Sequence, residues 1–455
     1  MRRHWVTMLM ALVLIGLGAY VYYVELPAER TQSETEAKEK KILPFTERDI
    51  TGLTMATGSS RLVLASKDGR WKIHEPLEAE ADTRVVDAMI RALVLGKVTR
   101  VVEDNASALA PFGLEKPSVV LTVATNNGQE TLSLGDSGPI SSTLYALRAS
   151  DRKILLTDLA PKDFLNKSLL TFRKKEVLTF DQGQVDRLRL TYPPTEIVLY
   201  RTDDKGGKKK WSIRYPIEAA ADQPEVRALL MKVEDMKAVG FIDPGPQHES
   251  VMQLLKKPDI KITVHAGGNE QTVKLFKPDP ASGEAFAVTT PEAPIYRINP
   301  TLIKDLNKDL FALQDKRLLG VEADDISMLA VKTRDEQYTL IRQNAVWVLE
   351  DAPHEKVDQE KAAIFVSRVA DLPAELRVVK QASPLAPYGL TTPAAEFTAT
   401  GKDGTQSGRL VLGAKAGGLV YAMGKSLPGI YQARSDLLTQ IPPKRELIQT
   451  AQGGS

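Results

Sequence analysis

Alternating apolar and polar residues form pairs of short runs before each of three tryptophans, Trp71, Trp211 and Trp347. A period of two residues is the pattern of a β-strand with one buried face. In the first copy, the turn Lys67-Asp68-Gly69 joins the second run to the tryptophan run, and Asp-Gly is typical of a tight hairpin. The pattern predicts three antiparallel units, each with a tryptophan-bearing strand. We expect these tryptophans to pack in the core; stacking on sugars is the alternative.

An amphipathic helix is predicted after each tryptophan strand, because apolar residues recur there at helical spacing. The residues that precede these helices are Asp82, Asp222 and Asp358. Aspartate is a favoured N-cap, since its side-chain oxygen accepts a hydrogen bond from a free backbone N–H of the first turn. Glu225 lies three residues after Asp222, which predicts a capping box in the second copy. We interpret the aspartates as caps and not as catalytic acids.

A turn and a strand follow the helix in the first and third copies, where APFGLEKP begins at Ala110 and APYGLTTP begins at Ala386. We expect Gly113 and Gly389 to supply a positive φ or a close backbone approach. The middle copy departs from this element, with VMQLLKKP beginning at Val251. Each copy then continues through further hairpins to a closing strand and a short helix.

These landmarks align into three repeats at residues 41–174, 175–316 and 317–455. Each repeat has the length of a domain, whereas solenoid repeats run at roughly 20–50 residues. The predicted fold class is therefore α+β: three tandem repeats, each a mostly antiparallel sheet with two helices.

The combination of W-x-I-x-x-P, a capped helix and A-P-[FY]-G-L-x-x-P resembles a bacterial family of domains of unknown function numbered 4340. The resemblance covers essentially all of the chain after residue 40. It implies a membrane-anchored extracytoplasmic protein, of a kind often encoded beside an ABC transporter and an auxiliary component of the gliding-motility type. It transfers no catalytic residues.

Residues 5–24 are uncharged and apolar. As a helix with a rise of about 1.5 Å per residue, they span the roughly 30 Å hydrocarbon core of a bilayer. Arg2 and Arg3 precede this segment and Glu25 follows it, so the positive-inside rule places residues 1–4 in the cytoplasm. The sequence predicts a single-pass protein of the inner (cytoplasmic) membrane, with its bulk in the periplasm or extracytoplasmic space.

A cleaved signal peptide is the alternative for this segment, because Gly16-Leu17-Gly18 offers small residues at a cleavage site. The apolar run continues past that site and exceeds the usual h-region, which favours a retained transmembrane helix. Residues 25–40 are charged and poor in apolar residues, as is typical of a solvated tether.

The composition restricts the chemistry. The 60 Lys plus Arg and 58 Asp plus Glu give a net charge of +2, which provides no drive toward nucleic acid. The chain has no cysteine, which excludes disulfides, thiolate metal sites and cysteine nucleophiles. Its 5 histidines lack metal-ligand spacing. Phosphate-loop, dinucleotide and nucleophile-elbow motifs are absent. We expect no enzyme, no cofactor, no metal, and no catalytic or cofactor-binding residues.

Five further segments have ordinary interpretations. The acidic pairs Asp203-Asp204 and Asp324-Asp325 are predicted in solvated turns, and the basic runs at 173–175 and 208–210 are predicted as solubilising loops. A basic run near a membrane could also meet anionic headgroups. The glycine-rich segment at 413–418 is interpreted as a hairpin loop and not as a phosphate cradle.

The predicted function is that of a non-enzymatic accessory or scaffold protein, associated with an ABC transporter permease or an auxiliary membrane subunit. The first alternative is a binding module for an envelope polymer or a transported solute. The second is a hydrolase with an unfamiliar constellation, which requires a buried polar cluster in one copy.

Overall fold

The structure is a computed structural model. It describes residues 40–449 apart from 59, 141, 161–163, 165–166, 204–206, 208, 278–282, 381–383, 403 and 405–406, together with residues 10, 14, 16, 17, 20 and 22. The predicted transmembrane segment at residues 5–24 and the predicted tether at 25–40 lie almost entirely outside the described residues. Among the described residues, no helix has the length and apolar character needed to cross a membrane.

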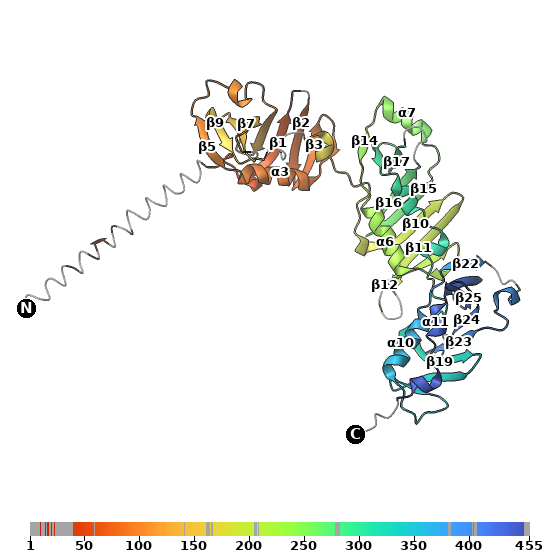
Figure 1. Cartoon of the computed structure of the whole chain (residues 1–455). Coiled ribbons are helices and arrows are strands. Elements are labelled where there is room, and N and C mark those ends of the chain that lie inside the picture. Colours follow the sequence, from red (N-terminus) through yellow and green to blue (C-terminus); the bar gives the residue numbers. More distant parts are fainter. Residues whose placement is uncertain are drawn as a thin grey trace, which may run out of the picture. The chain divides into compact units, whose positions relative to one another are not determined.

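Each predicted repeat contains one antiparallel sheet (Figure 1). The first sheet has nine strands in the order β4-β3-β2-β1-β6-β7-β8-β9-β5. Its strands are β1 (Ile50–Ala56), β2 (Arg61–Lys67), β3 (Arg70–Glu75), β4 (Ala79–Glu80), β5 (Val98–Glu103), β6 (Val119–Thr125), β7 (Gly128–Ser137), β8 (Leu144–Arg148) and β9 (Lys153–Thr157). The described helices of this repeat include α3 (Thr83–Leu95) and α5 (Leu169–Phe172). Two meanders therefore meet at the β1–β6 pair, and β5 forms an edge.

The second sheet repeats this order as β13-β12-β11-β10-β15-β16-β17-β18-β14. Its strands are β10 (Val185–Tyr192), β11 (Thr195–Asp203), β12 (Lys209–Tyr215), β13 (Ala219–Ala220), β14 (Gly240–Ile242), β15 (Ile260–Ala266), β16 (Asn269–Phe276), β17 (Ala285–Val288) and β18 (Ile295–Ile298). Its helices are α6 (Gln223–Glu234), α7 (Pro246–Leu254), α8 (Thr301–Leu306) and α9 (Leu310–Leu313). The expected two helices per repeat therefore understate the described part of the middle repeat.

The third sheet has eight strands in the order β21-β20-β19-β23-β24-β25-β26-β22. Its strands are β19 (Ile326–Thr333), β20 (Gln337–Gln343), β21 (Val346–Leu349), β22 (Leu376–Val379), β23 (Ala395–Gly401), β24 (Ser407–Ala416), β25 (Leu419–Gly424) and β26 (Ile430–Arg434). Its described helices include α10 (Gln359–Ala370) and α11 (Asp436–Thr439). The prediction of an α+β chain with three repeats is confirmed.

The three tryptophans are core residues, as predicted. Trp71, Trp211 and Trp347 are 5%, 7% and 5% exposed, and each belongs to the main hydrophobic cluster of its repeat. The apolar face of α3, α6 or α10 completes the same cluster. Burial at the same position three times favours packing over sugar stacking.

The predicted N-caps are confirmed, but the predicted capping box is wrong. Asp82, Asp222 and Asp358 each accept a hydrogen bond from a first-turn N–H. In a capping box the carboxylate of Glu225 would accept from the N–H of Asp222. That N–H instead donates to the Leu313 carbonyl at 2.8 Å, while Glu225 pairs with Lys308 at 2.6 Å. Residues from the end of the repeat, Lys308 and Leu313, therefore bind the two groups that a capping box would pair with each other.

The same closure occurs in every repeat. The N–H groups of Asp82 and Asp358 donate to the carbonyls of Phe172 and Leu447, at 2.7 and 2.8 Å. The closing segment of each repeat is therefore hydrogen-bonded to the N-terminus of the central helix of the same repeat.

The turns after the helices of the first and third repeats contain a glycine with a positive φ, as predicted. In the third repeat this turn packs on a second small core. Gly113 and Gly389 follow the 3-10 turns Ala110–Phe112 and Ala386–Tyr388 and have φ values of 67° and 68°. A glycine in the facing strand is also required: a Cβ on Gly413 would lie 2.3 Å from the Tyr388 carbonyl oxygen. The interpretation of 413–418 as one loop was wrong in this respect. Gly413 lies within β24, and the turn is Gly417-Gly418.

The chain divides into two compact units. The first comprises Met1–Glu176 and Lys237–Gly240, and the second comprises Val177–Met236 and Phe241–Ser455. The second and third repeats therefore belong to the same unit.

Candidate functional site

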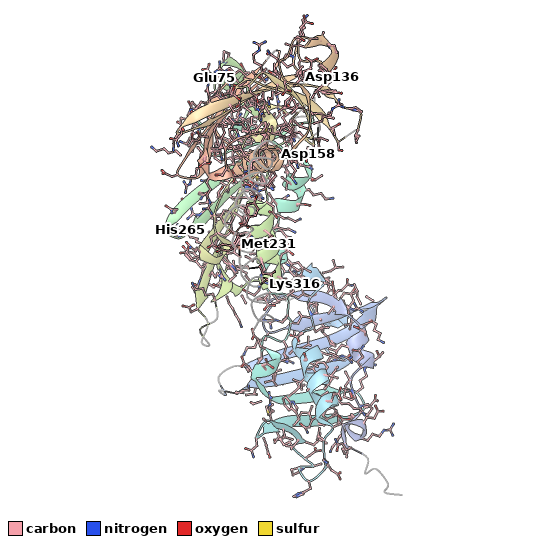
Figure 2. All side chains as sticks on the ribbon, turned by 90° about the vertical axis from the view of Figure 1, so that its left-hand side faces the viewer. Glu75, Asp136, Asp158, Met231, His265 and Lys316 are labelled. Atoms are coloured by element: carbon pink, nitrogen blue, oxygen red, sulfur yellow. The ribbon has the colours of Figure 1, made fainter. Side chains whose placement is uncertain are left out.

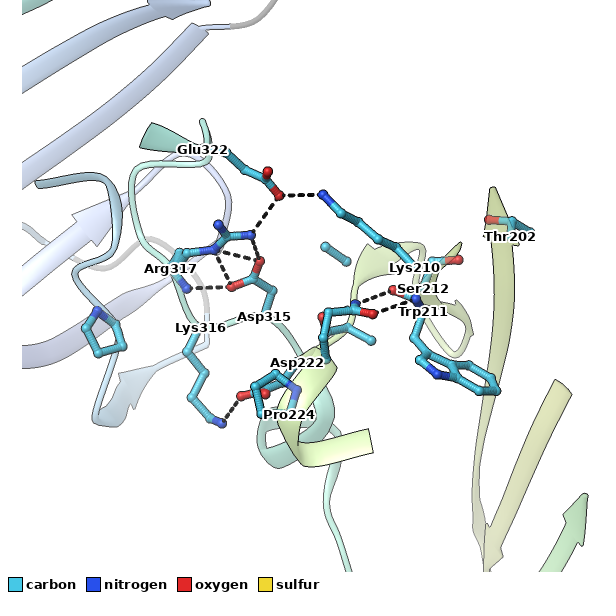
Figure 3. A pocket seen from close by; sticks show the side chains of 14 residues that line it. Thr202, Lys210, Trp211, Ser212, Asp222, Pro224, Asp315, Lys316, Arg317 and Glu322 are labelled. Carbon is cyan, nitrogen blue, oxygen red and sulfur yellow. Dashed lines mark hydrogen bonds and ion pairs between the residues drawn. The ribbon is translucent and has the colours of Figure 1, made fainter. Parts of the chain in front are cut away.

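A cleft of about 720 Å³ lies in the second compact unit, where the closing segment of the second repeat leads into the third (Figure 3). Strand β12 contributes Lys210 and Trp211, the start of α6 contributes Asp222 and Gln223, and the connecting segment contributes residues 315–317. The cleft is thus built from two repeats and a connection of a few residues.

Backbone hydrogen bonds hold this connecting segment on both sides. The Asp315 N–H donates to the Ala220 carbonyl of β13 at 2.9 Å. The Lys316 carbonyl accepts from the Ala374 N–H at 2.8 Å, next to β22. The backbone therefore passes from the sheet of one repeat to the next without a free linker.

Ion pairs line the cleft (Figure 3). The Arg317 guanidinium contacts both carboxylate oxygens of Asp315, with 2.6 Å from Nη2 to Oδ2, and reaches Glu322 at 3.4 Å. Lys210 Nζ lies 2.9 Å from Glu322 Oε1. Lys316 Nζ lies 3.1 Å from Asp222 Oδ2, so the N-cap carboxylate is also paired. Three cations and three carboxylates compensate one another across the repeat boundary.

These contacts shift two ionisation equilibria. The hydrogen bond from Arg317 to Asp315 raises the pKa of the guanidinium, against the opposing effect of burial. The hydrogen bond from Lys210 holds the pKa of the Glu322 carboxyl below its ordinary value. Both shifts stabilise the charged forms, which is the behaviour of a structural ion-pair network and not of a general acid or base poised near neutral pH.

A glutamine side chain covers the edge of the tryptophan strand in this cleft. Gln223 Oε1 accepts from the Trp211 N–H at 2.8 Å, and Gln223 Nε2 donates to the Trp211 carbonyl at 2.9 Å. Gln359 makes the same pair of hydrogen bonds to Trp347, at 2.7 and 2.8 Å. In the third repeat, where β21 is the edge strand, the amide thus pairs with backbone groups that an open edge would leave free. In the second repeat, β13 also flanks the tryptophan strand, and the Ala221 N–H donates to the Trp211 carbonyl at 3.3 Å. Our sequence reasoning missed this role, although the dipeptide Asp-Gln recurs at both helix starts.

Phe311 of α9 joins the two repeats on their apolar side. Its ring stacks on Tyr431 of β26, with centroids 5.8 Å apart and planes 17° apart, and the Arg377 guanidinium lies 5.0 Å from its centroid. A residue of the second repeat thus packs against the core of the third. The junction combines hydrophobic contact, backbone hydrogen bonds and ion pairs.

The structure places the residues considered from sequence on separate elements. His74 pairs with Glu78, the buried His248 contacts the Ala293 carbonyl, and His265 pairs with Asp186. The described residues contain no group of three or more His, Asp or Glu side chains that could hold a metal ion.

The basic runs are more structural than we expected. Arg173 is 6% exposed, and Lys174 pairs with Glu80 at 2.8 Å within the first unit. Lys210 belongs to the cleft network described above. These charges help to close and connect repeats, where the sequence suggested solubilising loops.

The chain is a repeat protein built of three tandem α+β domains, and each domain is closed by its own C-terminal segment in the same way. The profile of the family described as "Domain of unknown function (DUF4340)" matches residues 71–249, 211–376 and 347–450. Each match begins at a repeat tryptophan. The chain belongs to the DUF4340 family. No curated protein and no solved structure matches it.

The ion pairs of the cleft should stabilise the junction modestly. Arg317 is 35% exposed, so we expect Arg317→Ala to reduce local stability by roughly 0.5–1 kcal/mol at low salt, and by less at high salt. Because the folded-state pKa of Glu322 is lowered, its contribution is present above the ordinary glutamate pKa and is lost as the pH falls through the folded value. Hydrogen exchange of peptides covering 315–322, at two salt concentrations and across acidic pH, measures both effects.

Arg434→Ala is the matched control, because its guanidinium is 66% exposed beside Asp436. Equal changes at Arg317 and Arg434, or no salt dependence at Arg317, would contradict a stabilising network.

Proposed function

We propose that this protein is a membrane-anchored extracytoplasmic accessory or scaffold protein that acts without catalysis beside an ABC transporter permease or an auxiliary membrane subunit. The apolar segment at residues 5–24 supports the anchor. The transporter association rests on the resemblance to the family.

The observation that carries the proposal is the difference between positions that recur among repeats and positions that vary. The core tryptophan and the N-cap aspartate occur three times: each tryptophan is at most 7% exposed, and each aspartate accepts a hydrogen bond from a first-turn N–H. The exposed position three residues after the tryptophan is His74, Arg214 or Glu350. Shape is repeated and surface chemistry is not, which is the expected pattern for a spacer or interaction protein.

Co-purification tests the proposal. After extraction in mild detergent, we expect the full chain to retain an ABC permease or its auxiliary membrane subunit. Replacing residues 5–24 with a cleavable signal should weaken this association, because an anchor raises the effective concentration of the modules beside their partner. A mature N-terminus near Ala19, or unchanged association after release from the membrane, argues against the anchor's role.

One observation favours the alternative of a binding module. The cleft of about 720 Å³ has the size of small-molecule sites, and a solute carrying both charges could exchange with the pairs of Lys210 and Arg317. A ligand-dependent rise in melting temperature that is lost in Lys210→Gln and Arg317→Gln supports this function. Absence of any rise with envelope-polymer fragments or solutes leaves the scaffold function preferred.

A further inference from the structure

The second sheet has a core face and an outer face. Helices α6, α8 and α9 share the main hydrophobic cluster of this repeat with strand residues such as Leu188 and Leu199. Since side chains alternate along a strand, the residues next to these positions lie on the outer face. We define the outer strip as two neighbouring cross-strand rows of that face: Thr272, Thr263, Arg189, Val198 and Tyr215 in one, and Lys274, Lys261, Thr191 and Glu196 in the other.

Helix α7 limits the outer strip at one end. Its residue Val251 packs on a small cluster that includes Val288 of β17 (Figure 1), and Val288 lies opposite Lys274 in the register of β16 and β17. At the other end, Tyr215 of β12 is 53% exposed. Three strand spacings separate Lys261 on β15 from Tyr215, which is about 14 Å. The outer strip thus runs from the edge of α7 to an open aromatic ring.

The lysine pair of the outer strip is particular to the middle repeat. The register aligns Lys261 and Lys274 with Val120 and Ser133 in the first repeat, and with Glu396 and Val411 in the third. Arg189 likewise stands where the other repeats have Thr54 and Ala330. The chemistry of the outer strip is therefore separate from the shape that all three repeats share.

Lys261 and Lys274 lie directly opposite each other on β15 and β16. Both are half-buried, and neither forms an ion pair with any residue that the structure describes. Like charges at directly opposed positions of an antiparallel pair repel each other and destabilise the sheet. The lysine pair therefore costs stability in the free protein, and an anion bound between the two ammonium groups would offset that cost.

Two carboxylates flank the lysine pair, and each has another partner. Glu196, in the same row, lies 3.6 Å from the Arg189 guanidinium. Asp259, two residues before Lys261, lies 3.2 Å from Lys277 Nζ. The two lysines and these two pairs together hold four cations and two carboxylates. An anionic ligand therefore meets a net positive surface at the lysine pair.

We propose that the outer strip binds an acidic polysaccharide, whose carboxylates pair with Lys261 and Lys274 and whose sugar rings pack on Tyr215. A carboxylate between the ammonium groups replaces their repulsion with two attractions. The hydroxyls of Thr263 and Thr272, 2.9 Å apart, lie on the same two strands as the lysines. Their mutual hydrogen bond uses one of two protons, so one remains for a sugar oxygen. Tyrosine adds an apolar ring with a polar tip, which suits a sugar.

Titration with a defined uronate chain tests this proposal. The full-length chain in detergent is titrated by calorimetry with hexagalacturonate, which carries a carboxylate on every sugar, and with the neutral maltohexaose. We expect hexagalacturonate to bind more tightly, and we expect the difference to shrink in high salt. K261Q/K274Q should weaken hexagalacturonate binding at least about fivefold, the effect of losing two partly screened ion pairs. Because this variant removes a like-charge pair, it should fold at least as well as the unmodified chain.

Matched variants control for charge and for the ring. K332Q/K415Q removes two exposed lysines from β19 and β24 of the third repeat and should leave the affinity nearly unchanged. Y215F should retain binding, whereas Y215L should weaken it, because leucine is apolar but has no flat ring. Since Tyr215 is exposed, neither substitution should disturb the core.

Two results would overturn the proposal. The first is absence of hexagalacturonate binding, or equal binding by K261Q/K274Q and K332Q/K415Q. The second is a hexaglutamate peptide that binds as tightly as hexagalacturonate while Y215L keeps full affinity, since the outer strip would then be a general anion surface. All of these variants retain residues 5–24, Lys210 and Arg317, so the tests of the anchor and of the cleft succeed or fail independently.

Discussion

Replacing Trp71, Trp211 or Trp347 with alanine is expected to lower the unfolding free energy of the affected repeat by roughly 3–5 kcal/mol, the range for large aromatic core deletions. All three side chains are at most 7% exposed. Each lies between strands and the central helix of its repeat, so the loss of the ring leaves a cavity that the sheet cannot easily close. Hydrogen exchange resolved by peptide measures the effect repeat by repeat, which a single melting curve of a multidomain chain does not.

Met231→Ala is the control for Trp211→Ala. Met231 lies on α6 of the same repeat and is 49% exposed (Figure 2). Its truncation should change stability by less than about 0.5 kcal/mol. A similarly small effect at Trp211 would mean that the ring does not stabilise the core. That result would favour the alternative hypothesis, in which the tryptophan stacks on a sugar.

Gly413→Ala is expected to destabilise the third repeat by about 1–3 kcal/mol, as overpacking of a well-packed site does. The added Cβ would lie 2.3 Å from the Tyr388 carbonyl oxygen, which is backbone and cannot rotate away. A Cβ on Gly135 in the first repeat would likewise lie 2.1 Å from the Phe112 carbonyl oxygen, so Gly135→Ala should have a similar effect. Urea titration followed by hydrogen exchange in the 384–424 region measures the change.

Gly418→Ala is the matched control from the same hairpin. Nothing lies within 4 Å of a Cβ built at Gly418, so this substitution should be neutral or slightly stabilising through the unfolded state. If Gly413→Ala is as harmless as Gly418→Ala, the packing of the turn on β24 is not required for stability.

Local signals in the chain predicted most of the repeat architecture. Strand alternation depends on which face of a sheet is buried, and N-capping depends on residues within one helical turn. For this reason the core position of Trp71, the caps at Asp82 and Asp358, and the positive φ of Gly113 could all be predicted before any tertiary contact was known. Threefold recurrence strengthened each inference, since an accidental pattern does not repeat at equivalent positions.

The failed predictions concern groups with partners distant in sequence. Glu225 has the spacing of a capping box, yet Lys308 takes its carboxylate and Leu313 takes the N–H of the cap. In the sequence, Gly413 has the appearance of a loop residue. Its requirement for glycine comes from the Tyr388 carbonyl, which packs against it in the folded chain. A hydrogen bond or a steric contact between residues tens of positions apart depends on the final packing, which no local periodicity records.

The candidate site shows the same division. Lys210, Arg317 and Glu322 are ordinary charged residues in the printed sequence, and nothing in their spacing distinguishes them from solubilising charges. Folding brings strand β12 of the second repeat beside the first residues of the third. Lys210 Nζ then lies 2.9 Å from Glu322 Oε1. Strands, helices and caps follow from side-chain chemistry and backbone preference over a few residues. The closing segments, the glutamine-covered strand edge and the ion pairs of the cleft arise only when two sheets meet, because their energy comes from contacts that the unfolded chain does not make.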